Sequence, residues 1–117
     1  ASPSPSPSQL PTFDNCRDDD GAKNAPNFPV RIEWVDKDEE IVYLKNLSDA
    51  PIDITGWHMC SFRGAQEHPG ISGTLPPHQT ILFPNTGGNI WNNDDKDDGA
   101  LYNASGQAIS YWNDLNR

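Results

Sequence analysis

Four aspartates crowd a stretch of five residues, and their carboxylates could coordinate a hard cation such as Ca²⁺. They are Asp94, Asp95, Asp97 and Asp98. An EF-hand loop would need Asp or Asn at the position of Lys96, so a calcium ion would require an irregular site here. The alternative is a solvated loop whose charges keep a sheet edge from pairing with neighbouring molecules.

The histidines do not have the spacing of a zinc site. His58, His68 and His78 lie ten residues apart, whereas zinc ligands usually come in closely spaced pairs. No serine stands in a Gly-x-Ser-x-Gly setting, and no glycine-rich loop could cradle a phosphate. We therefore predict that the chain is not an enzyme.

The two cysteines, Cys16 and Cys60, can form at most one disulfide. Closing a loop of about 45 residues would stabilise the fold by roughly 4 kcal/mol through the lost entropy of the unfolded chain. We expect this bond, and two free thiols are the alternative.

The length and composition favour one all-β domain. At 117 residues the chain can build one hydrophobic core but not two. Its 11 prolines and 9 glycines favour turns and short strands over long helices. No window places apolar residues at helical spacing over the roughly ten residues that a helix requires. We expect little or no helix.

Seven short apolar runs, separated by turn-forming residues, indicate a sandwich or barrel. They are Val30 to Val35, Ile41 to Leu47, Ile52 to Phe62, Ile71 to Leu75, Thr80 to Phe83, Gly99 to Asn103 and Gln107 to Trp112. Alternation along the second run puts Val42 and Leu44 on one face and Tyr43 on the other.

Aromatic rings that face outward could stack on a sugar. Tyr43 is a candidate because it lies on the face opposite Val42 and Leu44. Tyr111 and Trp112, in the last run, are the other candidates for ligand stacking. The alternative is that the aromatic residues belong to the core.

Composition divides the chain into three segments. Residues 1–12 alternate proline with serine at their start, which is typical of a semi-rigid linker between modules. Residues 13–29 are acidic and irregular, and residues 30–117 hold the expected sandwich domain.

The net charge of -9 comes from three acidic stretches, at residues 14–20, 36–40 and 94–98, each with a charge of -3. This excess makes nucleic acid an unlikely partner, because phosphates would be repelled. No apolar run approaches the roughly 18 residues of a membrane span, so we expect no membrane insertion.

The order of these features resembles the lamin tail domain, in the divergent form found in bacterial secreted and surface proteins. The resemblance runs from about residue 32 to residue 112. Family members often have glycine where this chain has His78, which leaves the type of that turn open. The matching motif residues are Glu40, Val42, Leu44, Asn46, Gly56, Trp57, Trp91 and Gly106.

The resemblance implies an immunoglobulin-like β-sandwich of about seven short strands, with Trp57 and Trp91 in its interior and without catalysis of its own. We expect an interaction or positioning module with no cofactor unless calcium binds. It would be a monomeric domain of a larger bacterial protein, extracellular or at the cell surface, with a protein or cell-surface partner. Alternatives are a carbohydrate- or calcium-dependent surface-binding module and an accessory module of a secreted hydrolase.

Overall fold

The structure, a computed structural model, describes residues 16, 20–62, 66–68, 70–85, 90–91 and 97–114. The linker predicted at residues 1–12 lies outside the described residues, as do Asp94 and Asp95. Within the described part, no helix is long and apolar enough to cross a membrane.

The described residues form nine strands and one short 3-10 helix, η2 (Asp20–Asn24). The strands are β1 (Val30–Asp36), β2 (Ile41–Asn46), β3 (Ile52–Asp53), β4 (His58–Ser61), β5 (Gln66–His68), β6 (Thr74–Leu75), β7 (Thr80–Pro84), β8 (Gly99–Tyr102) and β9 (Ala108–Trp112).

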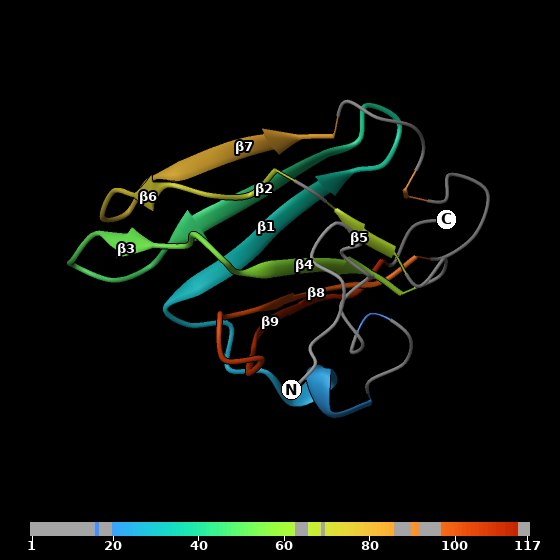
Figure 1. Cartoon of the computed structure of the whole chain (residues 1–117), viewed down its shortest axis with the longest axis horizontal. Coiled ribbons are helices and arrows are strands. Elements are labelled where there is room, and N and C mark those ends of the chain that lie inside the picture. Colours follow the sequence, from blue (N-terminus) through green and yellow to red (C-terminus); the bar gives the residue numbers. More distant parts are fainter. Residues whose placement is uncertain are drawn as a thin grey trace, which may run out of the picture.

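Two antiparallel sheets make the layers of a sandwich. One has the order β1-β2-β7 and the other β5-β4-β8-β9, while β3 and β6 form a small ribbon. Figure 1 shows β7, β2 and β1 as one layer facing β4, β8 and β9. The prediction of an all-β, immunoglobulin-like sandwich with little helix is confirmed.

The strands differ from the seven predicted runs in two places. The run from Ile52 to Phe62 divides into β3 and β4, because Gly56 adopts φ +87° in a turn where Trp57 N–H donates to the Ile54 carbonyl at 3.0 Å. The strand β5 has the sequence Gln-Glu-His, which contains none of the apolar residues that signal a strand.

The core lies between the two larger sheets. In β2 every second side chain is buried, so Val42 and Leu44 face the core as predicted. Burying each such side chain contributes about 1.5 to 3 kcal/mol. The buried apolar residues of this core are Val30, Ile32, Val35, Val42, Leu44, Ile54, Met59, Ile71, Leu75, Phe83, Trp91, Leu101 and Trp112.

A second buried cluster lies apart from this core. A disulfide joins Cys16 to Cys60 of β4, as predicted. Ala22 of η2 is also fully buried in this cluster, together with Ala100 and Tyr102 of β8. Because β8 is buried along its whole length, both of its faces are covered, the outer one by residues that include Cys16 and Ala22 of η2.

The turn between β6 and β7 shows how the chain accommodates His78. Gln79 N–H donates to the Pro76 carbonyl at 3.2 Å, and His78 has φ +61°. Proline at the second position followed by a positive φ at the third is the pattern of a type II turn, in which glycine is usual. The chain therefore forms this turn with His78 in the left-handed conformation, which strains the backbone at that residue.

Replacing His78 by glycine should leave the protein as stable or more stable by up to about 1 kcal/mol. Relief of the left-handed conformation is worth roughly 1 to 2 kcal/mol, and the added freedom of the unfolded chain costs about 0.5 to 1 kcal/mol. The lost contact of His78 Nε2 with Asp49 Oδ1 (2.7 Å) is exposed and contributes little.

Urea denaturation measures this effect, and Gln79→Gly is the matched control. Gln79 is the next exposed residue, and it does not have a positive φ. The control variant should lose about 0.5 to 1 kcal/mol. Equal losses in the two variants would contradict the assigned strain.

Candidate functional site

The outer face of the β1-β2-β7 sheet carries a row of large apolar side chains. Trp34 pairs in register with Tyr43, and Tyr43 pairs with Leu82. Directly opposed residues project to the same face of a sheet. Trp34 is 46% exposed and Leu82 50% exposed, and Tyr43 is partly exposed. We call Trp34, Tyr43 and Leu82 the aromatic row.

A β-bulge places Trp34 in this row. Ile32 pairs with Leu44 and is buried, and strict alternation would also turn Trp34 inward. The register of β1 and β2 shifts between Ile32 and Trp34, so that Glu33 is the extra residue. A bulge of this kind re-aims the side chains that follow it, and Trp34 therefore faces outward.

Two rows of residues flank the aromatic row on the same sheet face: one is polar, and in the other Asp36 is the polar residue beside two apolar ones. Arg31, Lys45 and Thr80 pair in register on one side. On the other side Asp36 pairs with Ile41, and Ile41 pairs with Pro84. Arg31 Nε donates to Glu33 Oε2 at 2.7 Å.

The formal charges on this face cancel. Arg31 and Lys45 contribute +2, and Glu33 and Asp36 contribute -2. The face is therefore neutral on a chain whose net charge is -9.

The three residues predicted to stack on a ligand differ in their exposure and surroundings. Tyr43 belongs to the aromatic row. The Tyr111 ring is half-buried beside Phe62, with centroids 6.2 Å apart, and its hydroxyl donates to the Asp98 carboxylate. The expectation that Trp112 faces outward is wrong: it is 9% exposed and belongs to the main core. The residue that sequence reasoning missed is Trp34.

Trp34 of the aromatic row is the first of three tryptophans that pack in a chain of edge contacts. The Trp34 and Trp112 rings are 5.8 Å apart at 85°, and the Trp112 and Trp91 rings are 6.3 Å apart at 89°. Edge-to-face pairs at these distances add about 0.5 to 1.5 kcal/mol beyond the area that they bury. Trp34 is thus held by its ring contact with Trp112 while nearly half of the residue remains exposed.

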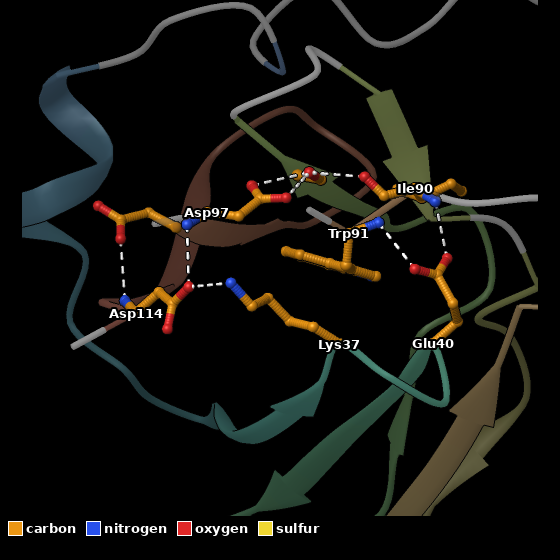
Figure 2. Close-up of polar contacts among 8 residues, drawn as sticks. Lys37, Glu40, Ile90, Trp91, Asp97 and Asp114 are labelled. Atoms are coloured by element: carbon orange, nitrogen blue, oxygen red, sulfur yellow. Dashed lines mark hydrogen bonds and ion pairs between the residues drawn. The ribbon is translucent and has the colours of Figure 1, made fainter. Parts of the chain in front are cut away.

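Glu40 holds Trp91 in place from the turn after β1. Its buried carboxylate accepts from Ile90 N–H at 2.7 Å and from Trp91 N–H at 2.9 Å (Figure 2). It also accepts from Asn85 Nδ2 at 3.0 Å. Glu40 also has φ +60°, a strained conformation for a residue with a side chain. The glutamate that carries the family resemblance is therefore an anchor for the Trp91 segment.

His68 is fully buried against Trp91. Its Nε2 lies 2.7 Å from the Phe83 carbonyl, which can only accept, so Nε2 carries the proton. Trp91 Nε1–H donates to His68 Nδ1 at 3.0 Å, so Nδ1 is unprotonated. Burial lowers the pKa of His68, and the hydrogen bond to Phe83 and the charge of Glu40 partly oppose this shift. The ring is neutral.

The stability of the protein should therefore fall as the pH drops below about 6.5, the usual histidine pKa. The unfolded chain then binds a proton at His68 that the folded state does not bind. The loss is at most about 1.4 kcal/mol per pH unit, and it ends at the lowered pKa of the folded state.

Urea denaturation between pH 8 and pH 5.5 tests this dependence. The wild type should lose stability over this range, and His68→Gln should lack the His68 share of the loss. His78→Gln is the control, because it removes an exposed histidine and leaves His68 in place. A wild-type slope in His68→Gln would contradict the assignment.

Part of the predicted calcium site belongs to an internal polar network. The Asp97 carboxylate is fully buried and accepts from the Ser61 hydroxyl at 2.7 and 2.8 Å, and Asp97 N–H donates to Asp114 Oδ2 at 2.9 Å. The same oxygen accepts from Lys37 Nζ at 2.5 Å (Figure 2). Asp98 Oδ1 accepts from Asp114 N–H at 2.9 Å.

Asp94 and Asp95, the other two predicted calcium ligands, lie outside the described residues. Among the residues that the structure does describe, no three His, Cys, Asp or Glu side chains form a group that could hold a metal ion. Each histidine has its own surroundings: His58 Nδ1 contacts Glu67 at 2.7 Å, and His78 contacts Asp49.

The remaining motif residues build turns and strand ends. The buried Asn46 side chain donates to the carbonyls of Ala50 (2.8 Å) and Leu75 (2.9 Å) and accepts from Ser48 N–H (2.8 Å). Gly106 has φ +86° in the hairpin between β8 and β9. Trp57, expected in the interior, is only partly buried and packs against the margin of the core.

The sandwich and its Glu40 anchor define an immunoglobulin-like module. A family comparison matches residues 23–114 to the lamin tail domain, and the chain belongs to this family. The match begins seven residues before the domain start expected at residue 30. A search of curated proteins returns no significant match.

The fold is also found among solved structures. One similar structure is the archaellum periplasmic stator protein complex FlaF and FlaG from Sulfolobus acidocaldarius, with a TM-score of 0.50 and 12% sequence identity. The match covers 96% of this chain and 97% of that chain. At this identity the likeness concerns the fold alone.

Proposed function

We propose that this chain is a non-catalytic binding module of a larger exported protein, and that it binds its partner through the aromatic row. The observation that carries the proposal is the contrast between the two outer sheet faces. Cys16 and η2 pack on one of them, while the other exposes Trp34 and Leu82. Exposed apolar side chains clustered on one face typically mark a binding site.

Export is supported by the disulfide between Cys16 and Cys60, because such bonds persist in oxidising compartments and are rare in the cytosol. The similar stator complex is described as periplasmic, so this fold occurs in exported assemblies. In this proposal the module positions its parent protein, and the chemistry, where there is any, resides elsewhere in that protein.

Co-sedimentation with washed cell envelopes of the producing organism tests the proposal. The purified domain should sediment with the envelopes, and Trp34→Ala should reduce the apparent affinity at least tenfold. Phe28→Ser is the matched control: Phe28 is 53% exposed but lies before β1 and outside the aromatic row. Equal sedimentation of all three proteins, or of none, would overturn the proposal.

A further inference from the structure

We propose that the aromatic row binds a neutral, extended polysaccharide, with sugar rings stacked on Trp34 and Tyr43. This inference rests on the proposed function and names the chemical class of its partner. Pyranose rings present apolar C–H faces, which suit the electron-rich faces of aromatic side chains.

The size of the face favours a slender ligand over a folded protein. Three strands about 4.8 Å apart and about six residues long cover roughly 15 by 20 Å, or about 300 Å². A stable protein interface buries about 800 Å² on each partner. The face of the β1-β2-β7 sheet is too small for such an interface, and it matches a short length of a single sugar chain.

The direction of the aromatic row suits a chain of sugar rings. Trp34, Tyr43 and Leu82 lie on three adjacent strands, so the row crosses the sheet in steps of about 4.8 Å. Successive rings of an extended polysaccharide can therefore follow the row from strand to strand. A small apolar ligand would require an enclosing pocket instead.

The residues beside the row can bind the hydroxyl groups of a sugar. Arg31, Lys45 and Thr80 supply donors along one side. Asp36 supplies a carboxylate acceptor on the other side, and Glu33, which pairs with Arg31, supplies a second one at the bulge. An apolar strip with donors and acceptors along its sides matches a pyranose, whose faces are apolar and whose rim carries hydroxyls.

The charges favour a neutral polysaccharide over an anionic one. The face itself has no net charge, so it offers no excess of cations to a carboxylated or sulfated sugar. The rest of the chain, at -9, repels such a ligand at low ionic strength. Binding should therefore depend little on salt.

The edge contact of Trp34 with Trp112 (5.8 Å, 85°) holds the Trp34 ring in place before a ligand binds. A ring that is already held in place loses little conformational entropy when a ligand stacks on it. Trp34 is also the most exposed tryptophan of the described residues, so its fluorescence should report directly on binding.

Two methods, affinity electrophoresis and pull-down, can test this inference. The neutral probes are amorphous cellulose, chitin and xylan, and the anionic probe is polygalacturonate. At least one neutral probe should retain the domain and shift its tryptophan emission to shorter wavelength, and polygalacturonate should bind at least tenfold more weakly. Trp34→Ala should weaken retention at least tenfold and abolish the emission shift.

Leu82→Gln keeps the test decisive if Trp34→Ala fails to fold, because Leu82 lies in the same row, is 50% exposed and leaves the Trp34–Trp112 ring contact unchanged in composition. It should weaken retention severalfold, while Phe28→Ser should retain wild-type binding. Retention that neither row variant alters would overturn the inference, and so would failure of every neutral probe.

The envelope experiment separates this inference from the proposed function. Envelope binding that requires Trp34, in the absence of binding to any polysaccharide, would identify a protein partner: the proposed function would stand and the sugar class would fall. Loss of both kinds of binding would overturn both.

Discussion

We expect Glu40→Ala to lower the free energy of unfolding by about 2 to 6 kcal/mol. The substitution leaves the main-chain N–H groups of Ile90 and Trp91 without the carboxylate that accepts from them, and each buried donor that loses its partner costs about 1 to 3 kcal/mol. Small domains have only about 5 to 15 kcal/mol of stability in total. Urea denaturation at pH 7.5 measures the loss.

Two further variants separate the hydrogen bonds of Glu40 from its charge. Glu40→Gln keeps one acceptor oxygen and replaces the other by a donor, so it should lose roughly half as much stability. Glu39→Ala, at the exposed neighbouring position, should stay within about 0.5 kcal/mol of the wild type. A loss of less than about 1 kcal/mol in Glu40→Ala would show that Glu40 does not anchor the Trp91 segment.

Removal of the disulfide has the second large expected effect. The bond closes a loop with a sequence separation of 44 residues, and the chain-entropy estimate for such a loop is about 4 kcal/mol. The variant Cys16→Ala/Cys60→Ala should lose about this amount. It should also expose the cluster of Ala22, Ala100 and Tyr102, because the chain at Cys16 is no longer bound to β4.

Chemical denaturation with and without a reducing agent checks this prediction. Reduced wild type should match the double alanine variant, and the reducing agent should not change the variant further. Alkylation of the unreduced wild type should find no free thiol. A double variant as stable as the oxidised wild type would show that the bond contributes nothing to the fold.

The sequence predicts the sandwich well because the signals of β2 are local. Alternation of Val42 and Leu44 with Tyr43 needs only neighbouring residues, and the turn residues between runs mark where strands end. The strand β5 is missed because Gln66 to His68 has no apolar pattern, and its place depends on pairing with β4.

The proposed binding face is harder to predict because its composition depends on a β-bulge. Simple alternation from Ile32 points Trp34 into the core, and only the extra residue Glu33 turns it outward. The prediction for Trp112 is wrong for a related reason. The local sequence around an aromatic residue near the end of a strand does not show which other strands will pack over it. The family motif signals that Glu40 has a structural role, but its partners Ile90 and Trp91 lie 50 and 51 residues further along the chain.

The disulfide also decides how the domain would bear a mechanical load. Tension applied between the two ends of the chain has a covalent path from Cys16 directly to Cys60 in β4, so η2 and the strands β1, β2 and β3 lie in a closed loop outside that covalent path. Two residues of the aromatic row, Trp34 and Tyr43, belong to this loop. Reduction would place the loop in the line of tension and release about 150 Å of additional extension at roughly 3.5 Å per residue.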